Sequence, residues 1–394
     1  MYAILINSLA DGGAEKVALT VLEGLIKRGH SFKLICLEKN HFYDIPEGAD
    51  VIYLSDADGN ENGMKKLLNL PVLAIILKGI IRKYHIQVVQ SHLFRANYVN
   101  ILAGILGAGH ESQVVSTGSI TAKYSKSGIS GKINLALIRL LYPKADLILT
   151  KSKGMLLDME NRFNFCVPKK VIYNPIKLSL IKSKQNEPFT KQEYAFDPDR
   201  RYIITMARMH SQKCLDILVQ SFASISEKFA STDLIFLGDG EERSKLQQEV
   251  KKFKLENRIF FVGRVQNPYK YLVRSHLFVL PSATEGFPNS LVEAMICNVP
   301  VISTDCMSGP REILAPESDI KKQIKKSIEF TPYGVLVPVK NYLLLAKAME
   351  TMLNDPQMSK SYAEKGYNRA CMFSADKIID EYERVIIKKE CGRC

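Results

Sequence analysis

The chain has 394 residues and a formal net charge of +13, and 46% of its residues are hydrophobic while 24% are charged. This length exceeds one ordinary core and predicts two domains, and the average composition excludes a disordered or a fibrous protein. The opening residues lack a basic leader, and the longest apolar stretch, residues 67–81, is interrupted by polar residues. We therefore expect neither a signal peptide nor a membrane-spanning helix.

Short β-rich apolar runs alternate with loops and amphipathic helical stretches along both halves of the chain. This alternation is typical of parallel α/β sheets, so the sequence predicts two doubly wound, Rossmann-like domains with the substrate in a cleft between two facing sheets. The expected strands are 2–6, 32–37, 87–90, 113–117 and 146–149 in the first half, and 202–206, 234–237, 259–262, 277–280 and 299–303 in the second. Expected helices include 14–28, 94–106 and three over 341–389.

The stretch Ser183–Arg201 is polar, contains two prolines and has no apolar periodicity, which indicates an interdomain linker. We assign residues 1–185 to the first domain, 186–200 to the linker and 201–370 to the second domain. Residues 371–394 are expected to form a C-terminal helix and tail, for which packing back on the first domain is one option.

Eight cysteines are scattered along the chain, six of them inside apolar stretches, which favours free thiols in a reducing cytoplasm. The terminal Cys391 and Cys394 form a lone CxxC pair without the further ligands of a zinc site. A frayed tail is favoured over a metal or redox site for this pair.

The first expected strand is followed by Ala10-Asp-Gly-Gly-Ala-Glu15, in which two glycines lead directly into a helix. Glycine lets a backbone approach a phosphate or sugar closely, and a helix N-terminus favours negative charge. The same pattern also fits a plain tight turn, so both interpretations stay open for Gly13.

Two loops of the second half carry further signals. Arg208 and Lys213 follow the first strand of this half. Two cations at such a place either neutralise a diphosphate or form a solvated basic turn. Gly238 and Gly240 follow the next strand, either as ligand-binding glycines or as a purely structural turn.

The strongest signal is the segment Pro281–Met295, in which Glu285 lies in a loop after a strand and Glu293 comes eight residues later, inside a helix. Carboxylates accept hydrogen bonds well from sugar and ribose hydroxyls. Asn289 or Ser290 suits the N-cap of this helix, so backbone amides are expected beside the first acid. A surface helix with two ordinary acids is the alternative.

These residues together resemble the retaining glycosyltransferases of family 4, which have two Rossmann-like domains in the GT-B fold. The resemblance covers nearly the whole chain. It rests on an ordered set of motifs: the Gly-Gly-Ala-Glu turn, Val171-Ile-Tyr-Asn174-Pro, Arg208 with Lys213, Gly238-Asp-Gly240, Glu285 to Glu293, and Ser308-Gly-Pro-Arg-Glu312. Each motif alone is a weak signal, whereas their common order is specific.

The resemblance implies a role for each matching residue. Arg208 and Lys213 would hold the diphosphate of a nucleotide-sugar donor, and Glu285 would contact the donor sugar. The remaining donor-binding residues would be Glu293 at the ribose, Gly13 and Gly238, and the backbone amides of Asn289, Ser290 and Leu291.

In such retaining enzymes the departing phosphate takes the acceptor's proton on the same face, so no enzymatic base is required. The enzyme then holds the two substrates in line and stabilises the leaving charge. The acidic pairs Asp56/Asp58 and Asp197/Asp199 lie in polar segments away from Glu285. We therefore expect no metal and no other cofactor.

One departure from the family pattern concerns the donor-sugar pocket. Many members have a histidine after the strand that matches 113–117, where this chain has Thr117-Gly-Ser119-Ile. Either Ser119 substitutes for that histidine as a hydrogen-bond partner or the pocket differs. His92 follows another strand end and is a candidate for acceptor contact, with structural packing as an equal alternative.

Positive charge is concentrated in the first half, where residues 62–145 contain 11 basic residues and one acid, interleaved with apolar residues. Such a segment is suited to bind an anionic membrane surface. The resemblance agrees with this interpretation, because acceptors of the family are often lipid-linked and bind the first domain. The segment also fits an ordinary buried helix with lysines at its rim. Nucleic acid is not expected as a partner, because no nucleic-acid-binding motif is evident.

We therefore expect a cytoplasmic enzyme, peripheral on the inner face of the membrane. It would transfer a hexose or N-acetylhexosamine from a UDP-linked donor to a glycan or lipid-linked saccharide, in the synthesis of cell-surface glycans such as lipopolysaccharide. Two alternatives stay open. A nucleotide-sugar epimerase shares the architecture, and a non-catalytic partner of a glycan-assembly complex would tolerate the missing histidine.

Overall fold

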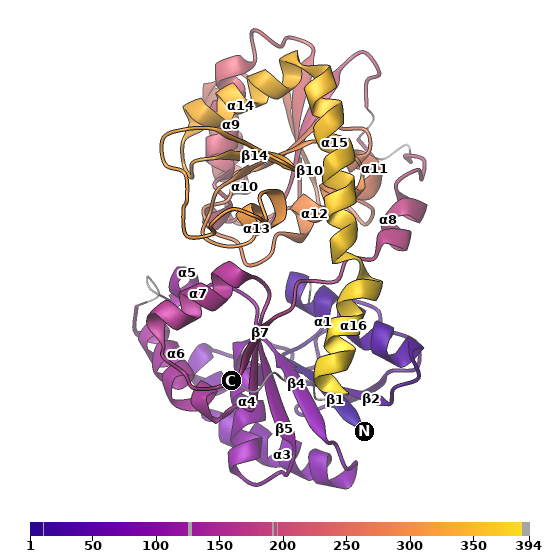
Figure 1. Ribbon diagram of the computed structural model, residues 1–394, viewed down its shortest axis with the longest axis vertical. Coiled ribbons are helices and arrows are strands. Elements are labelled where there is room, and N and C mark those ends of the chain that lie inside the picture. The colour runs from indigo at the N-terminus through magenta and orange to yellow at the C-terminus, as the bar shows by residue number, and fades with distance from the viewer. Residues whose placement is uncertain (11, 125–127, 191–192, 195, 388–394) are drawn as a thin grey trace. The chain divides into compact units, whose positions relative to one another are not determined.

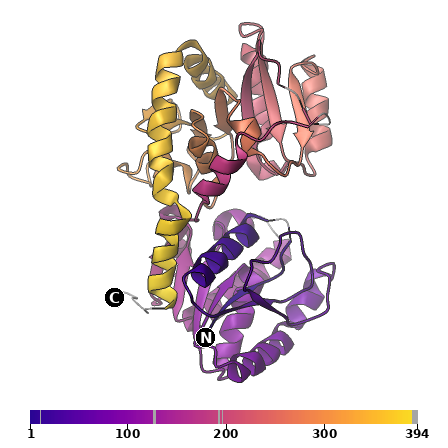
Figure 2. The same cartoon turned by 90° about the vertical axis from the view of Figure 1, so that its right-hand side faces the viewer.

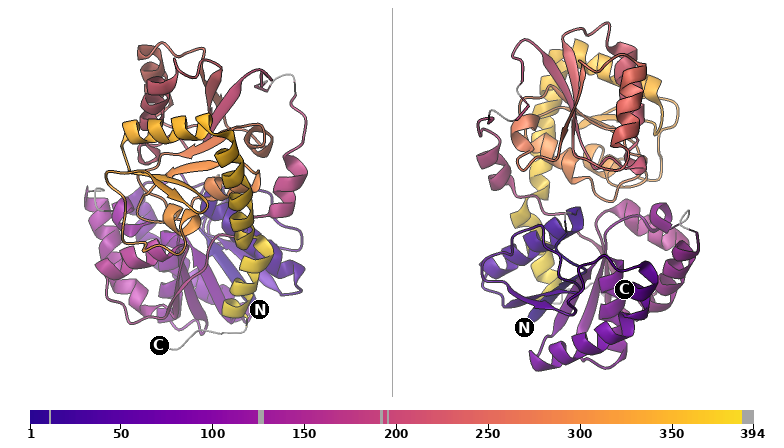
Figure 3. Two further views of the ribbon diagram at one scale, coloured as in Figure 1. Left: turned by 45° about the horizontal axis from the view of Figure 1, so that its top comes forward. Right: turned by 180° about the vertical axis from the view of Figure 1, so that it is seen from behind.

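A computed structural model describes residues 1–10, 12–124, 128–190, 193–194 and 196–387. The chain forms two compact units, the first comprising Met1–Pro175 with Ala375–Cys394 and the second comprising Ile176–Ser374 (Figure 1). In each unit, helices cover both faces of a central sheet (Figure 3). Among the described residues, no helix combines the length and the apolar character that crossing a membrane requires.

The first unit is built on a seven-stranded sheet in the order β3-β2-β1-β4-β5-β6-β7, in which every pairing is parallel. Its strands are β1 (Tyr2–Ile6), β2 (Phe32–Cys36), β3 (Asp50–Tyr53), β4 (Val88–His92), β5 (Glu111–Ser116), β6 (Leu147–Thr150) and β7 (Lys169–Val171). Its helices are α1 (Gly13–Lys27), α2 (Gly63–Leu68), α3 (Leu70–Lys83), α4 (Phe94–Ile105), α5 (Ile120–Tyr124), α6 (Gly128–Leu141), α7 (Lys153–Arg162) and α16 (Ala375–Ile386).

The two faces of this sheet carry separate cores because successive side chains of a strand point to opposite sides. Ala3 and Leu5 of β1 pack with the residues of α3 and α4. Ile4 and Ile6 pack on the other face with residues of α1 and α16. A strand that is buried on both faces has a continuous apolar sequence, which is why β1 could be predicted.

The C-terminal helix α16 completes the core of the first unit, beside α1 (Figure 2). Gly24 of α1 leaves space for Ile379, whose Cδ1 atom would lie 2.1 Å from a Cβ added at Gly24. Arg28 forms ion pairs of 2.6 Å with both Asp380 and Glu383. The first unit is therefore assembled from both ends of the chain.

The second unit contains a seven-stranded sheet in the order β10-β9-β8-β11-β12-β14-β13, in which only β13 is antiparallel to its neighbour among the described pairings. Its strands are β8 (Arg201–Met206), β9 (Thr232–Leu237), β10 (Ile259–Gly263), β11 (Leu277–Leu280), β12 (Val301–Thr304), β13 (Glu329–Thr331) and β14 (Gly334–Val337). Its helices are α8 (Leu178–Lys184), α9 (Leu215–Ile225), α10 (Arg243–Lys252), α11 (Tyr269–Leu272), α12 (Asn289–Ile296), α13 (Pro310–Leu314), α14 (Tyr342–Asn354) and α15 (Pro356–Ala370).

The second unit begins earlier than the boundary expected at residue 185. The Asn267 side chain donates a 2.8 Å hydrogen bond to the carbonyl oxygen of Lys184, which ties α8 to this unit. The described part of the expected linker also packs here, because Phe189 lies 4.8 Å from Tyr271 and Phe196 lies 4.5 Å from Tyr202 between ring centroids. Because the segment is polar on average, its sequence did not predict that Phe189 and Phe196 pack against the second unit.

Some of the expected features cannot be compared with the structure. Residues 191, 192 and 195 of the expected linker lie outside the described residues, and so does the tail that carries Cys391 and Cys394. The same holds for Asp11 in the first glycine-rich turn.

Candidate active site

The candidate active site of the second unit lies at the carboxyl ends of the neighbouring strands β8 and β11. Ligands of parallel sheets bind at this edge. The loop after β8 contains Arg208 and ends in a short 3-10 helix, Ser211–Lys213, while the loop after β11 contains Glu285. The backbone amide of Ala283 donates a 2.8 Å hydrogen bond to the carbonyl oxygen of Gln212, which joins the two loops.

Lys213 and Glu285 form the ion pair at the centre of this site. The Lys213 Nζ atom lies 2.6 Å from Glu285 Oε1, and the two side chains are 26% and 9% exposed. A partly buried carboxylate requires a partner, and Lys213 supplies it. The pair leaves the ammonium group accessible to a ligand from solvent.

Arg208 lies on the same loop but does not take part in this pair. Its side chain is 70% exposed, and its only ion pair among those described is a 3.4 Å contact with Glu241. His210 contacts the same carboxylate at 3.5 Å. An exposed guanidinium with one long, solvated contact is free to exchange it for an anionic ligand, because such surface pairs contribute little.

The turn after β9 explains why glycines are required at Gly238 and Gly240. A Cβ atom at Gly238 would lie 2.2 Å from the carbonyl oxygen of Ala207, and one at Gly240 would lie 2.4 Å from that of Met209. The φ angle of Gly238 is also +119°, a conformation that side chains disfavour. These glycines let the turn pack directly against the backbone on both sides of Arg208.

Helix α12 begins one or two residues earlier than expected. Pro288 takes the N-cap position and no side chain caps the helix, so the prediction of an N-cap at Asn289 or Ser290 is wrong. The Leu291 amide donates to the carbonyl oxygen of Pro288 at 3.1 Å, whereas the Ser290 amide has no acceptor among the described residues. An amide without a helical partner at the start of a helix, such as that of Ser290, attracts acceptors such as hydroxyl or phosphate oxygens.

Glu293 lies one turn further along α12 and is 5% exposed. The Tyr269 hydroxyl lies 3.4 Å from its Oε1 atom. Burial and this contact restrict the Glu293 carboxylate, as suits a group that orients a ligand hydroxyl.

The three candidate residues of the first unit have different surroundings. Gly13 is the first residue of α1, and no described heavy atom lies within 4 Å of the position that a Cβ would take. The Ser119 hydroxyl donates a 2.8 Å hydrogen bond to Asp158 inside the unit. His92 is fully buried, its Nε2 atom lies 3.3 Å from Gln90 Oε1, and its Nδ1 atom has no described partner. These contacts favour structural packing for Ser119 and His92.

Burial and the nearby Lys151 keep the pKa of His92 well below its usual value. Lys151 itself is buried at the carboxyl end of β6 and contacts the Tyr382 hydroxyl of α16. Burial lowers the pKa of Lys151 to about 7. The burial of Lys151 could not be predicted from the sequence, where it is a single lysine after an apolar run.

Sequence reasoning also missed a cavity of about 330 Å³ in the first unit. Its walls include Glu38, which follows β2, and Arg95, which follows β4. These two residues form a 2.6 Å ion pair with side chains 6% and 14% exposed, and Lys66 of α2 also lines the cavity. Glu38, Lys66 and Arg95 are far apart in the sequence, so no local motif could reveal that they line one cavity.

The acidic pairs outside this site are engaged locally. Lys39 pairs with Asp56 at 2.6 Å, and the Asp58 side chain accepts hydrogen bonds from Asn60. The Asp197 side chain accepts one from the Asp199 amide. Within the described ranges, no group of three or more His, Cys, Asp or Glu residues could hold a metal ion.

Two Rossmann-like units, with cations and carboxylates gathered at the carboxyl ends of the second sheet, are the arrangement expected of a glycosyltransferase of the GT-B type. The sequence matches the model of glycosyltransferase family 4 over residues 11–180 and that of glycosyl transferases group 1 over residues 186–369. The chain belongs to glycosyltransferase family 4.

Among curated relatives, the chain is similar to N-acetylgalactosamine-N,N'-diacetylbacillosaminyl-diphospho-undecaprenol 4-alpha-N-acetylgalactosaminyltransferase of Campylobacter jejuni. The two are 31% identical over 377 residues, which cover 95% of this chain and 96% of the relative. A glycosyltransferase of Methanocaldococcus jannaschii is 34% identical over 278 residues, covering 66% of this chain and 68% of its own.

Solved structures share the fold over the full length. Sucrose-phosphate synthase from Thermosynechococcus elongatus superposes with a TM-score of 0.80 at 17% identity, covering 100% of both chains. The Anabaena protein HepE, solved in complex with UDP, gives a TM-score of 0.73 at 18% identity, covering 98% of this chain and 100% of its own. The predicted two-domain GT-B architecture is thereby confirmed.

Proposed function

We propose that this protein transfers a hexose or N-acetylhexosamine from a UDP-linked donor to a lipid-linked saccharide, with retention of the donor's anomeric configuration. The observation that carries the proposal is the 2.6 Å pair of Lys213 and Glu285 at the carboxyl ends of β8 and β11. The Campylobacter jejuni relative, whose name describes a sugar transferred to a diphospho-undecaprenol-linked saccharide, supports the acceptor class. HepE, solved with UDP, supports the nucleotide.

Each side chain of the second unit has a proposed task. Arg208 and Lys213 neutralise the donor diphosphate, whose negative charge grows as the glycosidic bond breaks. Glu285 accepts a hydrogen bond from the donor sugar, and its 2.6 Å pairing with Lys213 holds the carboxylate in place for that purpose. Glu293 accepts from the ribose, while the first amides of α12, at Asn289 and Ser290, and the turn at Gly238 border the donor.

The proposed reaction needs neither a protein base nor a metal. The leaving phosphate oxygen takes the acceptor proton on the same face, and the bond to the sugar forms there as the bond to the diphosphate breaks. The cations of Arg208 and Lys213 stabilise the departing charge, which is the task that a divalent cation performs in other phosphate-releasing enzymes. Gly13, open at the start of α1, is proposed as a further contact to substrate phosphate.

We further propose that the first unit attaches the enzyme to the inner face of the cell membrane, where lipid-linked acceptors are extended into cell-surface glycans such as lipopolysaccharide. Successive turns of α2 and α3 expose apolar side chains, each at least 40% accessible: Met64, Leu68, Val72, Ile75 and Ile76. Spacings of three and four residues place Val72, Ile75 and Ile76 on one face of α3, and Met64 and Leu68 on one face of α2. The same two helices contain the basic residues Lys65, Lys66, Arg82 and Lys83. Apolar and basic side chains together bind anionic lipid surfaces.

The proposed activity is tested by incubating the purified protein with a panel of nucleotide sugars and a short-chain polyprenyl diphosphate-linked saccharide. The proposal expects acceptor mass to increase by one sugar only with UDP donors, together with release of UDP, in the presence of a chelator. Transfer from a different nucleotide donor would correct the donor assignment. Release of an altered free hexose without acceptor extension would indicate an epimerase instead.

A further inference from the structure

The segment after β12 contacts the backbone of the Glu285 loop. The Ser308 hydroxyl donates a hydrogen bond to the carbonyl oxygen of Glu285. Ser308 itself is 2% exposed, so water does not compete for this contact. The residue that carries the proposed sugar contact is therefore held at its carboxylate by Lys213 and at its backbone by Ser308.

The residue after Ser308 fixes how closely the two segments approach. Gly309 has a φ angle of +91°, and a Cβ at this position would lie 2.5 Å from Cδ of Pro288 and 3.1 Å from the carbonyl oxygen of Gly286. Only glycine accommodates both the conformation and the distance. The segment 308–309 thus packs directly on the loop that leads from Glu285 into α12.

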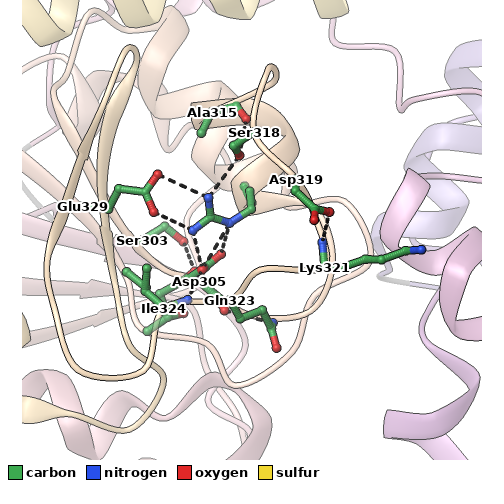
Figure 4. A network of polar contacts seen from close by, with 11 residues as sticks. Ser303, Asp305, Ala315, Ser318, Asp319, Lys321, Gln323, Ile324 and Glu329 are labelled. Atoms are coloured by element: carbon green, nitrogen blue, oxygen red, sulfur yellow. Dashed lines mark hydrogen bonds and ion pairs between the residues drawn. The ribbon is translucent and has the colours of Figure 1, made fainter.

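An ionic network joins Asp305 and Arg311, the residues that flank this segment in the chain. The side chains of Asp305, Ser318 and Glu329 converge on one point (Figure 4), where the guanidinium of Arg311 donates to Asp305 at 2.6 Å and to Glu329 at 2.7 Å. It also donates to the Ser318 hydroxyl at 3.0 Å. The Asp305 carboxylate further accepts the backbone amide of Ile324 at 2.7 Å.

This network resists displacement because it is sheltered from solvent. The side chains of Asp305 and Arg311 are 0% and 7% exposed. Moving Arg311 away would leave the buried Asp305 carboxylate without its cation, which is costly. Residues 305–311 therefore provide a rigid support on which Ser308 rests.

We propose that Ser308 is a positioning residue for the transfer reaction, which orients the Glu285 carboxylate toward the donor sugar by holding the Glu285 backbone from the support formed by Asp305 and Arg311. The inference rests on the proposed function, because it assigns Glu285 to the donor sugar. Ser308 acts through Glu285 and does not contact the substrate. Its loss reduces the rate of transfer and leaves donor affinity almost unchanged, since a small misplacement of a reacting-site group costs rate more than binding.

The experiment is a double-mutant cycle of Ser308→Ala and Glu285→Gln, with kcat and donor KM measured at saturating acceptor. Ser282→Ala is the matched control, because Ser282 is a fully buried serine at the start of the same loop, and its hydroxyl has no partner among the described residues. We expect Ser308→Ala to lower kcat about tenfold with donor KM within about twofold of the wild type, and Ser282→Ala to change neither by more than about twofold.

The cycle separates positioning from general support of the fold. In the Glu285→Gln background, Ser308→Ala is expected to lower kcat by no more than about twofold further, because the group that it orients is already impaired. The inference would be overturned if Ser308→Ala lowered kcat by the same factor in the Glu285→Gln background as in the wild type. Wild-type kcat in Ser308→Ala alone would also overturn it. If Ser308→Ala does not fold, Ser308→Cys, which keeps the size but weakens the donor, replaces it in the same cycle.

Failure of the proposed function gives a different result. Wild-type kcat in Glu285→Gln would remove Glu285 from the reaction and, with it, the proposed function of the site. A strong effect of Glu285→Gln combined with a neutral Ser308→Ala would overturn the positioning role alone.

Discussion

The Nζ atom of Lys213 lies 2.6 Å from Oε1 of Glu285, although the two residues are 72 positions apart in the chain. They meet because β8 and β11, which are far apart in sequence, are neighbours in the second sheet. The contact joins the cation proposed for the donor diphosphate to the acid proposed for the donor sugar. A change at either residue should therefore affect the other.

Replacing Lys213 by Ala should lower kcat by at least tenfold. The substitution removes a charge-assisted contact to the leaving phosphate, worth on the order of 2–4 kcal/mol in the transition state, and it also leaves Glu285, 9% exposed, without its partner. Arg208→Ala should lower kcat by at least tenfold as well, through the phosphate alone. Steady-state kinetics at saturating donor check both values.

Lys251→Ala provides the control for these charge changes, because Lys251 is exposed in the last turn of α10. It should keep wild-type kinetics. Near-wild-type rates in both Lys213→Ala and Arg208→Ala would remove the diphosphate assignment.

The two acids of the motif should give different kinetic defects. Glu285→Gln keeps the shape of the side chain and weakens its acceptance from a sugar hydroxyl, so kcat should fall. Glu293→Ala removes the proposed ribose contact, so donor KM should rise while kcat changes little. A rise in KM for Glu285→Gln together with a fall in kcat for Glu293→Ala would exchange the two assignments.

The sequence predicted most of the strands that are buried on both faces, because their continuous apolar runs are distinctive. Residues 2–6 and 277–280 were predicted with the observed ends. The strands β3, β7, β13 and β14 were missed. The first three are short and lie at sheet edges, where burial imposes no clear pattern. Strand β14 is buried but has only four residues, too short a run to be distinctive. Local patterns thus report the centre of each sheet better than its margins.

The candidate site shows the same limit. Arg208, Lys213 and Glu285 could be found because each belongs to a local motif after a strand. That Lys213 contacts Glu285 while Arg208 faces Glu241 depends on tertiary packing, which spacing alone does not contain.

Stability should depend on pH through Lys151. Burial lowers the pKa of this residue to about 7 in the folded protein, whereas in the unfolded chain it is near 10.4. Between these values the unfolded state binds more protons, so this residue makes folding more favourable as pH rises. From pH 7 to 8.5, the wild type should gain about 1–2 kcal/mol of unfolding free energy relative to Lys151→Met.

Urea unfolding of both proteins at pH 7.0, 7.75 and 8.5 measures this difference. The comparison removes contributions that both proteins share, among them the buried thiol of Cys36, whose pKa burial raises. A difference between the two proteins that stays constant over this range would show that Lys151 does not titrate there.

Membrane attachment should depend on charge and on salt. Each Lys or Arg near an anionic surface contributes about 1 kcal/mol, so three or four engaged cations hold a protein reversibly. The protein should float with phosphatidylglycerol-containing vesicles at low salt and float poorly at about 1 M salt, where screening shortens to roughly 3 Å. Binding should be lost when Lys65, Lys66, Arg82 and Lys83 are changed to Gln.

A matched control removes the same charge from the second unit. Lys321, Lys322, Lys325 and Lys326 are exposed, and changing these four to Gln should leave flotation intact. Equal flotation with neutral vesicles would indicate apolar insertion through residues such as Leu68 and Ile75 alone. No flotation under any condition would rule out the membrane surface as a partner.

The central claim is that sugar moves from a UDP donor to a lipid-linked saccharide with retention at the site that Lys213 and Glu285 form. The most direct measurement is the NMR spectrum of the extended acceptor, prepared with each UDP sugar that supports transfer and with Glu285→Gln run in parallel. The account predicts one added sugar in the α configuration of the donor, formed at a much lower rate by the variant. A β-linked product, or equal product from the variant, would contradict it.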